Sequence, residues 1–324
     1  MSLSAPTVTV VIPTRNRPTL LSRALASALA QTFHDLEVVV VVDGPDPETL
    51  TVLEGHRDAR LRYHVNPSPI GGAGARNVAV RLARGRWIAL LDDDDVWLPT
   101  KLTSQMPGLE AGSTGDRVGF TRLIARAPHG DYLWPRRAPR PGEHISDYLF
   151  VRRSLFAGEG GVQTSTLVAP RELLLAHPFD EELPRLQDTD WLLRVCAAGA
   201  ELEFCPGALT VWHIEEARQT ITSAHGADWR QLLEWIRERR HLVTDRAYAA
   251  FLLVRGGTAT SAARDMRGAR IVWRAAWAHG APGPLDVLLF LSRWAAPPQA
   301  RAWIRARLSP GRMQRGRDVE GAQR

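Results

Sequence analysis

The amino-acid sequence predicts an α/β fold with a mostly parallel central sheet, followed by a C-terminal helical extension. Three observations favour this fold class. Apolar, β-branched runs alternate with helical patterns over residues 7–91. The segments between these patterns are short, as in parallel sheets whose strands are joined by right-handed crossovers. From about residue 224 onward, strand-like runs stop and amphipathic helical patterns take their place.

Composition and charge indicate a globular protein with two unlike halves. The chain has 324 residues, a length that allows one large or two modest domains. Of these residues, 44% are hydrophobic and 23% are charged, as is ordinary for a globular protein. Residues 217–324 carry 19 arginines and 8 carboxylates, whereas the whole chain has a net charge of +6. The preceding part is therefore net acidic. We predict one domain over residues 1–223 and a basic helical extension over residues 224–324.

The sequence shows no sign of export or membrane insertion. Its N-terminal residues lack a basic region followed by an apolar core, and no run of about 18 apolar residues occurs. Cys196 and Cys205 make neither a metal-like nor a disulfide framework, and we expect both to be buried thiols. We therefore expect a cytoplasmic protein.

The elements of the front half follow from the pattern in order. A strand over residues 7–12 ends at the polar segment 13–16, and Pro18 opens a helix with apolar residues at helical spacing. The uninterrupted apolar run 37–42 predicts a strand buried on both faces, ending at Asp43. The remaining predictions are a helix over 47–55, a strand over 61–65, a glycine-rich turn at 71–74, a helix through Arg76 and a strand over 87–91.

Beyond Trp97 the periodic pattern weakens. We predict strands over 118–124 and 162–170, separated by a mobile loop over 127–142 that is rich in proline and arginine. Helices are expected from residue 171 and after Leu186, the second closed by Gly199, with short strands over 202–205 and 208–213. In the extension we predict helices over 229–240, 247–254 and 262–277, followed by apolar segments over 285–294 and 303–308 that arginines separate, and we expect the last dozen residues to be disordered.

Four consecutive carboxylates, Asp92 to Asp95, directly follow the strand at 87–91. Two like charges about 4 Å apart repel by roughly 4 kcal/mol at an effective dielectric constant near 20, so a cation is expected nearby. Hard divalent ions take carboxylate oxygens together with substrate phosphates. The cluster therefore predicts a metal–phosphate site, and the alternative is an acidic turn that faces water.

Polar side chains follow each of the predicted parallel strands at the same edge of the sheet. Residues 13–15, Asp43, Asn66 and Asp92–Asp95 all lie where a strand ends. Ligands of open α/β sheets bind beyond the carboxyl ends of the strands. We therefore expect these side chains to line one binding site.

Several ordered motifs resemble those of the family 2 glycosyltransferases, which have the GT-A (Rossmann-like) fold. The resemblance covers roughly residues 7–215 and rests on VTVVIPTRNR, VVVVVDGP, the block NPSPIGGAGARNVAVRLARGRWIALLDDDDVWLPTKL, and FDEELPRLQDTDWLLRV. It implies an inverting transfer of a sugar from a nucleoside-diphosphate donor, a UDP-sugar by default, to a glycan or lipid-linked acceptor. It also implies a divalent metal cofactor, Mn²⁺ or Mg²⁺.

The resemblance assigns the acidic cluster to the family's Asp-X-Asp motif. It implies that Asp94 contacts the metal directly, that Asp92 lies near the donor's ribose or a metal-bound water, and that Asp93 belongs to the same nucleotide-sugar site. His213, in a Val-Trp-His segment, matches a late histidine that completes the metal or diphosphate site in some relatives; the alternative is a structural histidine. Asp95 falls outside the motif and is expected to hold the loop.

The resemblance also places the donor's nucleoside. Pro13, Thr14 and Arg15 match positions that line the nucleoside pocket, and Asp43 matches the aspartate that accepts a hydrogen bond from the base. Arg76 falls on the family's Ala-Arg-Asn sequence and is expected to reach the base or the diphosphate, or else to pair with the acidic cluster. The sequence departs from the family at Val42, which replaces the first of two aspartates, and at Pro45, which replaces a serine, so the identity of the base stays open.

Asp188 matches the catalytic base of the family. A carboxylate near the acceptor hydroxyl would remove its proton during attack on the sugar. The alternative role is a helix N-cap, and Asp190 is the rival candidate for the base. Gln187 stands where the family has a glutamate, and an amide cannot take a proton.

The basic extension leaves two interpretations open. Apolar residues interleaved with arginines suit peripheral contact with anionic lipid, and they equally suit helices that pack on the catalytic domain. Two other functions remain as alternatives: a non-catalytic sugar- or nucleotide-binding assembly protein, and a nucleotide-sugar pyrophosphorylase. The latter class has a glycine-rich loop with a lysine after its first strand, which this chain lacks. No nucleic-acid-binding module is recognised, and the sugar, acceptor and linkage are not specified by the sequence.

Overall fold

The structure is a computed structural model that describes residues 5–111, 116–127, 130–155, 158–214, 228–295 and 312–313, the last pair by backbone alone. The chain forms two compact units. Unit 1 comprises Met1–Ala127, Val162–Glu216 and Gln314–Arg324; unit 2 comprises Pro128–Gly161 and Ala217–Met313. Within the described residues, no helix is both long and apolar enough to traverse a bilayer.

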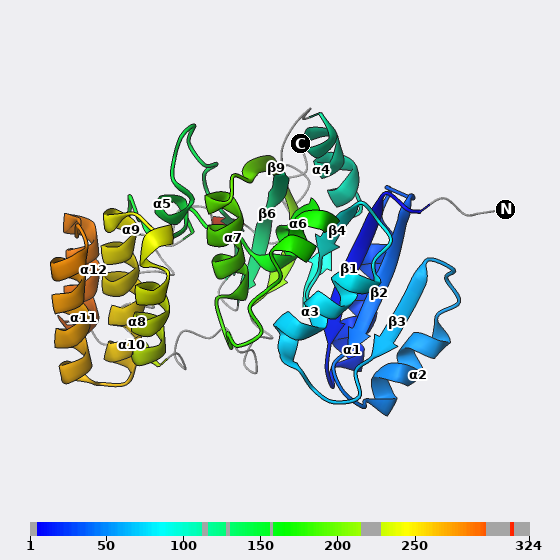
Figure 1. Ribbon diagram of the computed structural model, residues 1–324, viewed down its shortest axis with the longest axis horizontal. Coiled ribbons are helices and arrows are strands. Elements are labelled where there is room, and N and C mark those ends of the chain that lie inside the picture. The colour runs from blue at the N-terminus through cyan, green and yellow to red at the C-terminus, as the bar shows by residue number, and fades with distance from the viewer. Residues whose placement is uncertain are drawn as a thin grey trace. The chain divides into compact units, whose positions relative to one another are not determined.

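Unit 1 is built on a mostly parallel sheet, which confirms the predicted fold class (Figure 1). Strands β4 (Trp87–Leu90), β1 (Val8–Thr14), β2 (Leu36–Val42) and β3 (Leu61–Val65) lie side by side in this order and are parallel. The sheet continues beyond β4 through β8 (Val168–Pro170), which is antiparallel to both β4 and β6 (Arg117–Ala127). Strand β9 (Glu201–His213) runs parallel to β6 and pairs with the short β5 (Val96–Trp97).

The central strands are buried on both faces, which explains their unbroken apolar runs. Alternate residues of β1, Val8, Val10 and Ile12, join one core with the apolar face of α1 (Pro18–Leu29). The other residues of β1 are also buried, and α3 (Gly71–Leu82) packs on β1 and β2. Further helices of unit 1 are α2 (Pro47–Gly55), α4 (Lys101–Glu110), α6 (Arg171–Ala176), α7 (Gln187–Ala197) and the 3-10 helix η1 (Thr164–Thr166).

The structure differs from the sequence-based expectations at several elements. The glycine-rich segment 71–74 is not a separate turn but the first turn of α3, entered through Gly71 at a φ of +84°. The two short strands predicted over 202–205 and 208–213 form one strand, β9, with a register irregularity opposite Thr121 and Arg122 of β6. The strand predicted over 162–170 is η1 followed by β8. The predicted mobile loop contains the strand β7 (Gly130–Trp134).

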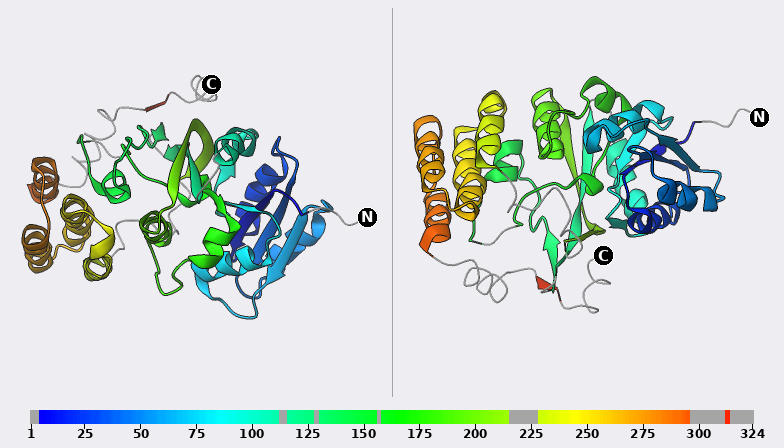
Figure 2. Two further views of the ribbon diagram at one scale, coloured as in Figure 1. Left: turned by 45° about the horizontal axis from the view of Figure 1, so that its top comes forward. Right: turned by 90° about the horizontal axis from the view of Figure 1, so that it is seen from below.

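Unit 2 is mainly helical (Figure 2). An aromatic cluster of Phe150, Trp235 and Phe251, with ring centroids 5.0 to 6.3 Å apart, joins three of its helices. Its elements, besides β7, are α5 (Ile145–Phe150), α8 (Trp229–Glu238), η4 (Arg240–Leu242), α9 (Asp245–Phe251), the π-helix η5 (Leu252–Gly256), α10 (Gly257–Ala262), α11 (Met266–His279), α12 (Pro284–Ala295) and β10 (Arg312–Met313).

One prediction for this part was wrong, because the helix predicted over 262–277 is interrupted. Arg264 has a φ of +53°, and Asp265 caps a new helix by accepting from the backbone N–H of Gly268 at 2.7 Å. The apolar segment over 303–308 lies outside the described residues, as do the final residues that were expected to be disordered, apart from β10.

Candidate functional site

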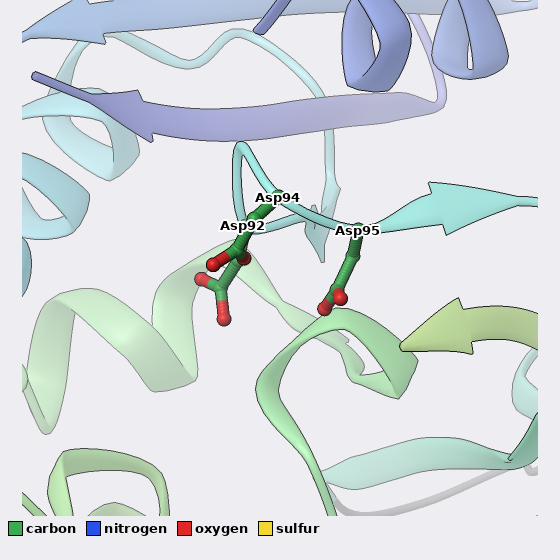
Figure 3. Close-up of side chains that lie close together, drawn as sticks. All are labelled: Asp92, Asp94 and Asp95. Atoms are coloured by element: carbon green, nitrogen blue, oxygen red, sulfur yellow. The ribbon is translucent and has the colours of Figure 1, made fainter. Parts of the chain in front are cut away.

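Three of the four consecutive aspartates bring their carboxylates together at the carboxyl edge of the sheet. Strand β4 ends at Leu90, and the loop then turns tightly, with the N–H of Asp95 donating to the carbonyl oxygen of Asp92 at 3.1 Å. One carboxylate oxygen from each of Asp92, Asp94 and Asp95 lies within 4.8 Å of the others. Figure 3 shows all three side chains on the same side of the loop, with Asp92 and Asp94 adjacent.

Asp95 is the member of this cluster that the sequence analysis did not assign to the metal. Its side chain is fully buried, and its Oδ2 accepts from the Ser165 hydroxyl and from Nε2 of Gln163, each at 2.6 Å. Its Oδ1 is also buried, and it has no hydrogen-bond partner among the described residues. Asp95 therefore holds the loop, as expected, and also offers an oxygen to the cluster. The signal in the sequence was the fourth consecutive aspartate itself.

The acidic cluster holds its negative charge at a cost. Burial, together with the negative charges of the neighbouring Asp92 and Asp93, raises the pKa of Asp94 to about 6. Burial likewise raises the pKa of Asp93, and it raises that of Asp95 well above its ordinary value. A cation at the cluster would restore the charged forms. Three convergent carboxylates with a spare buried oxygen fit a hard divalent ion, which prefers such ligands.

Asp93 lies apart from the three-carboxylate cluster and faces the end of β1. Thr14 Oγ1 donates to its Oδ2 at 2.8 Å, and Nη1 of Arg17 lies 3.1 Å from its Oδ1. The same Nη1 lies 3.3 Å from Oδ2 of Asp94. Sequence reasoning missed Arg17, although it follows directly on the polar segment at the end of the first strand.

Arg76 connects the acidic loop to α7. Its Nη2 lies 2.5 Å from Oδ1 of Asp92, and its Nη1 donates to Oε1 of Gln187 at 2.9 Å. Burial lowers the pKa of Arg76, but Asp92, together with the charges of Asp188 and Asp93, outweighs this and raises the pKa above its ordinary value. The side chain also lies over the ring of Phe179, 5.8 Å from its centroid. Arg76 thus pairs with the acidic cluster, and its contact with the base or the diphosphate stays a prediction.

Asp43 fixes the loop that leads into α3. Its Oδ1 accepts from Nδ2 of Asn66 at 3.0 Å and from the backbone N–H of Ile70 at 2.8 Å, and its Oδ2 accepts from the N–H of Gly71 at 2.8 Å. This network explains why the glycine segment starts a helix, because a carboxylate at a helix N-terminus satisfies its free N–H groups. Pro13 is buried within β1, opposite Val41, and Arg15 is exposed.

Asp188 lies in the first turn of α7 and is tied to the same turn that holds Asp95. Thr164 Oγ1, from η1, donates to Oδ2 of Asp188 at 3.3 Å, and the N–H of Thr189 donates to its Oδ1 at 2.7 Å. The N-cap position of this helix is Leu186, so Asp188 does not cap it. The rival Asp190 is fully buried and accepts from Nε of Arg194 at 2.8 Å, as a helix-supporting residue does.

The described residues do not bring His213 into the carboxylate cluster. It lies at the end of β9, 8% exposed, in register with Arg126 of β6. Its part in metal binding stays a prediction. The site thus consists of the cluster, Arg17, Arg76, Asp43 and Asp188, all in unit 1.

Fold and site together define a GT-A-like protein with an acidic centre at the carboxyl edge of its sheet. Among solved structures, TarS of S. aureus, residues 1–349 in complex with UDP-GlcNAc, matches 89% of this chain and 87% of TarS with a TM-score of 0.61 at 18% identity. The mannosyltransferase PcManGT of Pyrobaculum calidifontis, in complex with GDP-Man and Mn²⁺, matches 92% of this chain and 83% of that protein with a TM-score of 0.56 at 19% identity.

Sequence comparisons narrow this class. The family model described as "Glycosyl transferase family 2" matches residues 9–151. The succinoglycan biosynthesis protein ExoO of Rhizobium meliloti is 39% identical over 214 residues, which span 65% of this chain and 62% of ExoO. The chain spans less than two thirds of ExoO, and about 40% of two beta-1,3-glucosyltransferases of Escherichia coli. Over residues 9–151 the chain is therefore similar to glycosyltransferase family 2.

Proposed function

We propose that this chain is an inverting glycosyltransferase that moves a sugar from a nucleoside-diphosphate donor, by default a UDP-sugar, to a glycan or lipid-linked acceptor. One observation carries the proposal: the end of a single sheet presents a three-carboxylate cluster, and η1 links that cluster to the candidate base, Asp188. Similarity to glycosyltransferase family 2 supports the reaction class. The complexes of the fold relatives TarS and PcManGT contain nucleotide sugars.

The proposed cofactor is a divalent metal, Mn²⁺ or Mg²⁺. Asp94, Asp92 and Asp95 would hold it, with His213 as a further candidate. When bound, such an ion would neutralise the negative charge that develops on a departing diphosphate. Asp95 Oδ1, which is buried without a partner among the described residues, supports this ligand set.

The remaining roles follow from the positions of the side chains. Asp188 would take the proton of the acceptor hydroxyl. Arg76 would add a positive charge beside the diphosphate, because its fixed guanidinium lies against the acidic loop. Pro13, Thr14, Arg15, Asp43 and Asp93 would form the nucleoside side of the site. For Asp43, the carboxylate that holds Ile70 and Gly71 would also accept from the base.

The acceptor and location belong to the same proposal. Names of two relatives from Escherichia coli give a diphosphoundecaprenol acceptor, which favours a lipid-linked acceptor here as well. We propose that the protein works in the cytoplasm in peripheral contact with the inner face of the membrane, through unit 2. On α11 and α12 the exposed apolar residues Trp277, Leu288 and Leu291 are each more than half exposed, and α11 also carries exposed Arg267, Arg270 and Arg274.

Charge favours an anionic membrane over other occupants of that surface. Residues 296–324, which follow α12, carry seven arginines and two carboxylates, so they share its positive sign. A second copy of the protein would bring the same charge. Arginines near an anionic bilayer contribute about 1 kcal/mol each, and tryptophan is enriched at the membrane interface.

The test of the enzymatic proposal is a panel of nucleotide sugars incubated with the protein and Mn²⁺ or Mg²⁺. We expect slow release of the nucleoside diphosphate from one donor, and its loss in Asp94→Asn. Glu172→Gln, which removes one exposed carboxylate of unit 1, should behave like wild type. If no donor released its nucleoside diphosphate, with or without candidate acceptors, the result would favour a non-catalytic binding protein.

A further inference from the structure

Arg17 occupies the position of a cation between two carboxylates of the acidic loop. A single nitrogen, Nη1, lies 3.1 Å from Oδ1 of Asp93 and 3.3 Å from Oδ2 of Asp94. Asp94 is also a member of the three-carboxylate cluster. The positive charge that this residue needs is therefore supplied, in the absence of a metal, by the protein itself.

Arg76 and Arg17, which both pair with carboxylates of the acidic loop, are held differently. Arg76 uses both terminal nitrogens on fixed partners, and its side chain is only 12% exposed. The Arg17 side chain is 31% exposed. Among the described residues, it contacts Asp93 and Asp94 through Nη1 alone. Its Nε and Nη2 remain available to another anion. Arg17 can therefore leave the carboxylates at lower cost than Arg76.

We infer that Arg17 is an internal counter-ion that a divalent metal displaces from Asp94 and that then pairs with the donor's diphosphate. A metal that binds alone must compete with the guanidinium for Asp94 and tolerate its positive charge nearby. A diphosphate that binds with the metal offers Arg17 new acceptor oxygens, since guanidinium groups pair well with phosphates.

The consequence is that the binding of the metal and the binding of the nucleotide are coupled. Arg17 weakens metal binding when no nucleotide is present and strengthens nucleotide binding when the metal is present. By linkage, each ligand then raises the affinity for the other by the same factor. The nucleotide half of this inference rests on the proposed function, whereas the metal half rests only on Arg17 and the carboxylates.

The metal half is tested with Mn²⁺ alone, counted by electron paramagnetic resonance on the full-length protein without nucleotide. We expect Arg17→Gln to bind Mn²⁺ on the order of tenfold more tightly than wild type, which corresponds to about 1.4 kcal/mol. Arg17→Lys keeps the charge but has a single ammonium group, so its affinity should fall between the two. The matched control is Arg84→Gln, which removes an arginine near Glu37, at the start of β2, and should bind Mn²⁺ like wild type.

A second titration repeats the measurement in the presence of UDP. UDP should raise the Mn²⁺ affinity of wild type by a larger factor than that of Arg17→Gln. Equal or weaker Mn²⁺ binding by a folded Arg17→Gln protein, or none by either form, would overturn the inference. If Arg17→Gln does not fold, Arg17→Lys decides, because affinity equal to wild type would then count against a shared counter-ion. Turnover is not needed for either titration, so a chain without transferase activity would contradict the proposed function alone.

Discussion

Arg76 and Gln187 join α3 to α7 through a hydrogen bond of 2.9 Å between Nη1 and Oε1. The partner on α7 is an uncharged amide, and the nearest carboxylate to this guanidinium is that of Asp92, at 2.5 Å from Nη2. A glutamate at position 187 would place a second negative charge against the same arginine. With glutamine, more of the positive field of Arg76 remains directed at the proposed diphosphate.

We expect Arg76→Lys to weaken binding of the nucleoside diphosphate in the presence of metal. A lysine has one ammonium group and cannot reach Gln187 and Asp92 together, so it loses a charge-assisted hydrogen bond. Loss of about 1.5 kcal/mol would weaken UDP binding roughly tenfold, as measured by calorimetric titration. Arg81→Lys, on the last turn of the same helix, is the control. Unchanged UDP affinity would mean that Arg76 only positions the acidic loop.

Asp188→Asn should separate binding from chemistry. The amide keeps the shape of the side chain but cannot accept a proton, so kcat for transfer should fall by about 10² to 10⁴. UDP affinity should stay within a factor of two or so, because no nucleotide contact is proposed for this residue. If Asp190→Asn instead gave the large loss in kcat, Asp188 would not be the base.

The only lysine of the chain gives unit 1 a pH-dependent stability. Lys101 is fully buried, its Nζ lies 2.6 Å from Oε1 of Gln105, and it faces the Trp97 ring. Burial lowers the pKa of Lys101 to about 7. Between that value and the unfolded value near 10.4, the unfolded chain binds a proton that the folded chain lacks, so stability rises with pH in this window.

We expect Lys101→Met to remove this rise. The slope of the unfolding free energy between pH 7 and 8.5, from urea titrations, should be lower than in wild type by up to about 1.4 kcal/mol per pH unit. Below pH 7 the lysine is charged in both states and its full cost is present. Cys196, whose pKa burial raises to about 11, acts with the opposite sign at higher pH, and its contribution cancels in the comparison. If the unfolding free energies of wild type and Lys101→Met changed in parallel with pH, Lys101 would keep its charge in the folded protein.

The proposed membrane contact is tested by flotation with vesicles that contain an anionic lipid. The pair Leu288→Ser and Leu291→Ser should reduce co-flotation, because it removes apolar side chains that would enter the interface. Arg270→Gln with Arg274→Gln should reduce it as well, and high salt should mimic that pair. Leu155→Ser changes an equally exposed leucine outside these helices and is the control. Self-association of the wild type without any vesicle binding would favour a second copy as the occupant.

Much of the sheet could be predicted because burial on both faces leaves unbroken apolar runs such as residues 37–42. Short links between those runs then imply a parallel order. The glycine segment at 71–74 was misjudged because its helical start is fixed by Asp43, whose bonds to Ile70 and Gly71 span 27 and 28 positions in the sequence. No local pattern carries that information.

The candidate site also contains residues that the sequence could predict and residues that it could not. Asp92 to Asp95 were visible as a run after a strand, and the family motif pointed to Asp188. Arg17 and the bonds of Ser165 to the acidic loop were not visible, because they join segments about 70 or more positions apart. Such contacts depend on how the elements pack, and they cannot be predicted from the spacing or the type of residues in the sequence.

The 3-10 helix η1 has a mechanical meaning. Ser165 accepts from the N–H of Asp92 and donates to Asp95, while the preceding Thr164 donates to Asp188. A displacement of this short segment would therefore disturb the acidic cluster and Asp188 together. Redesign of the proposed acceptor pocket would therefore have to keep the hydroxyl groups of Thr164 and Ser165. Without them, the distance between the acidic cluster and Asp188 would no longer be fixed by one segment.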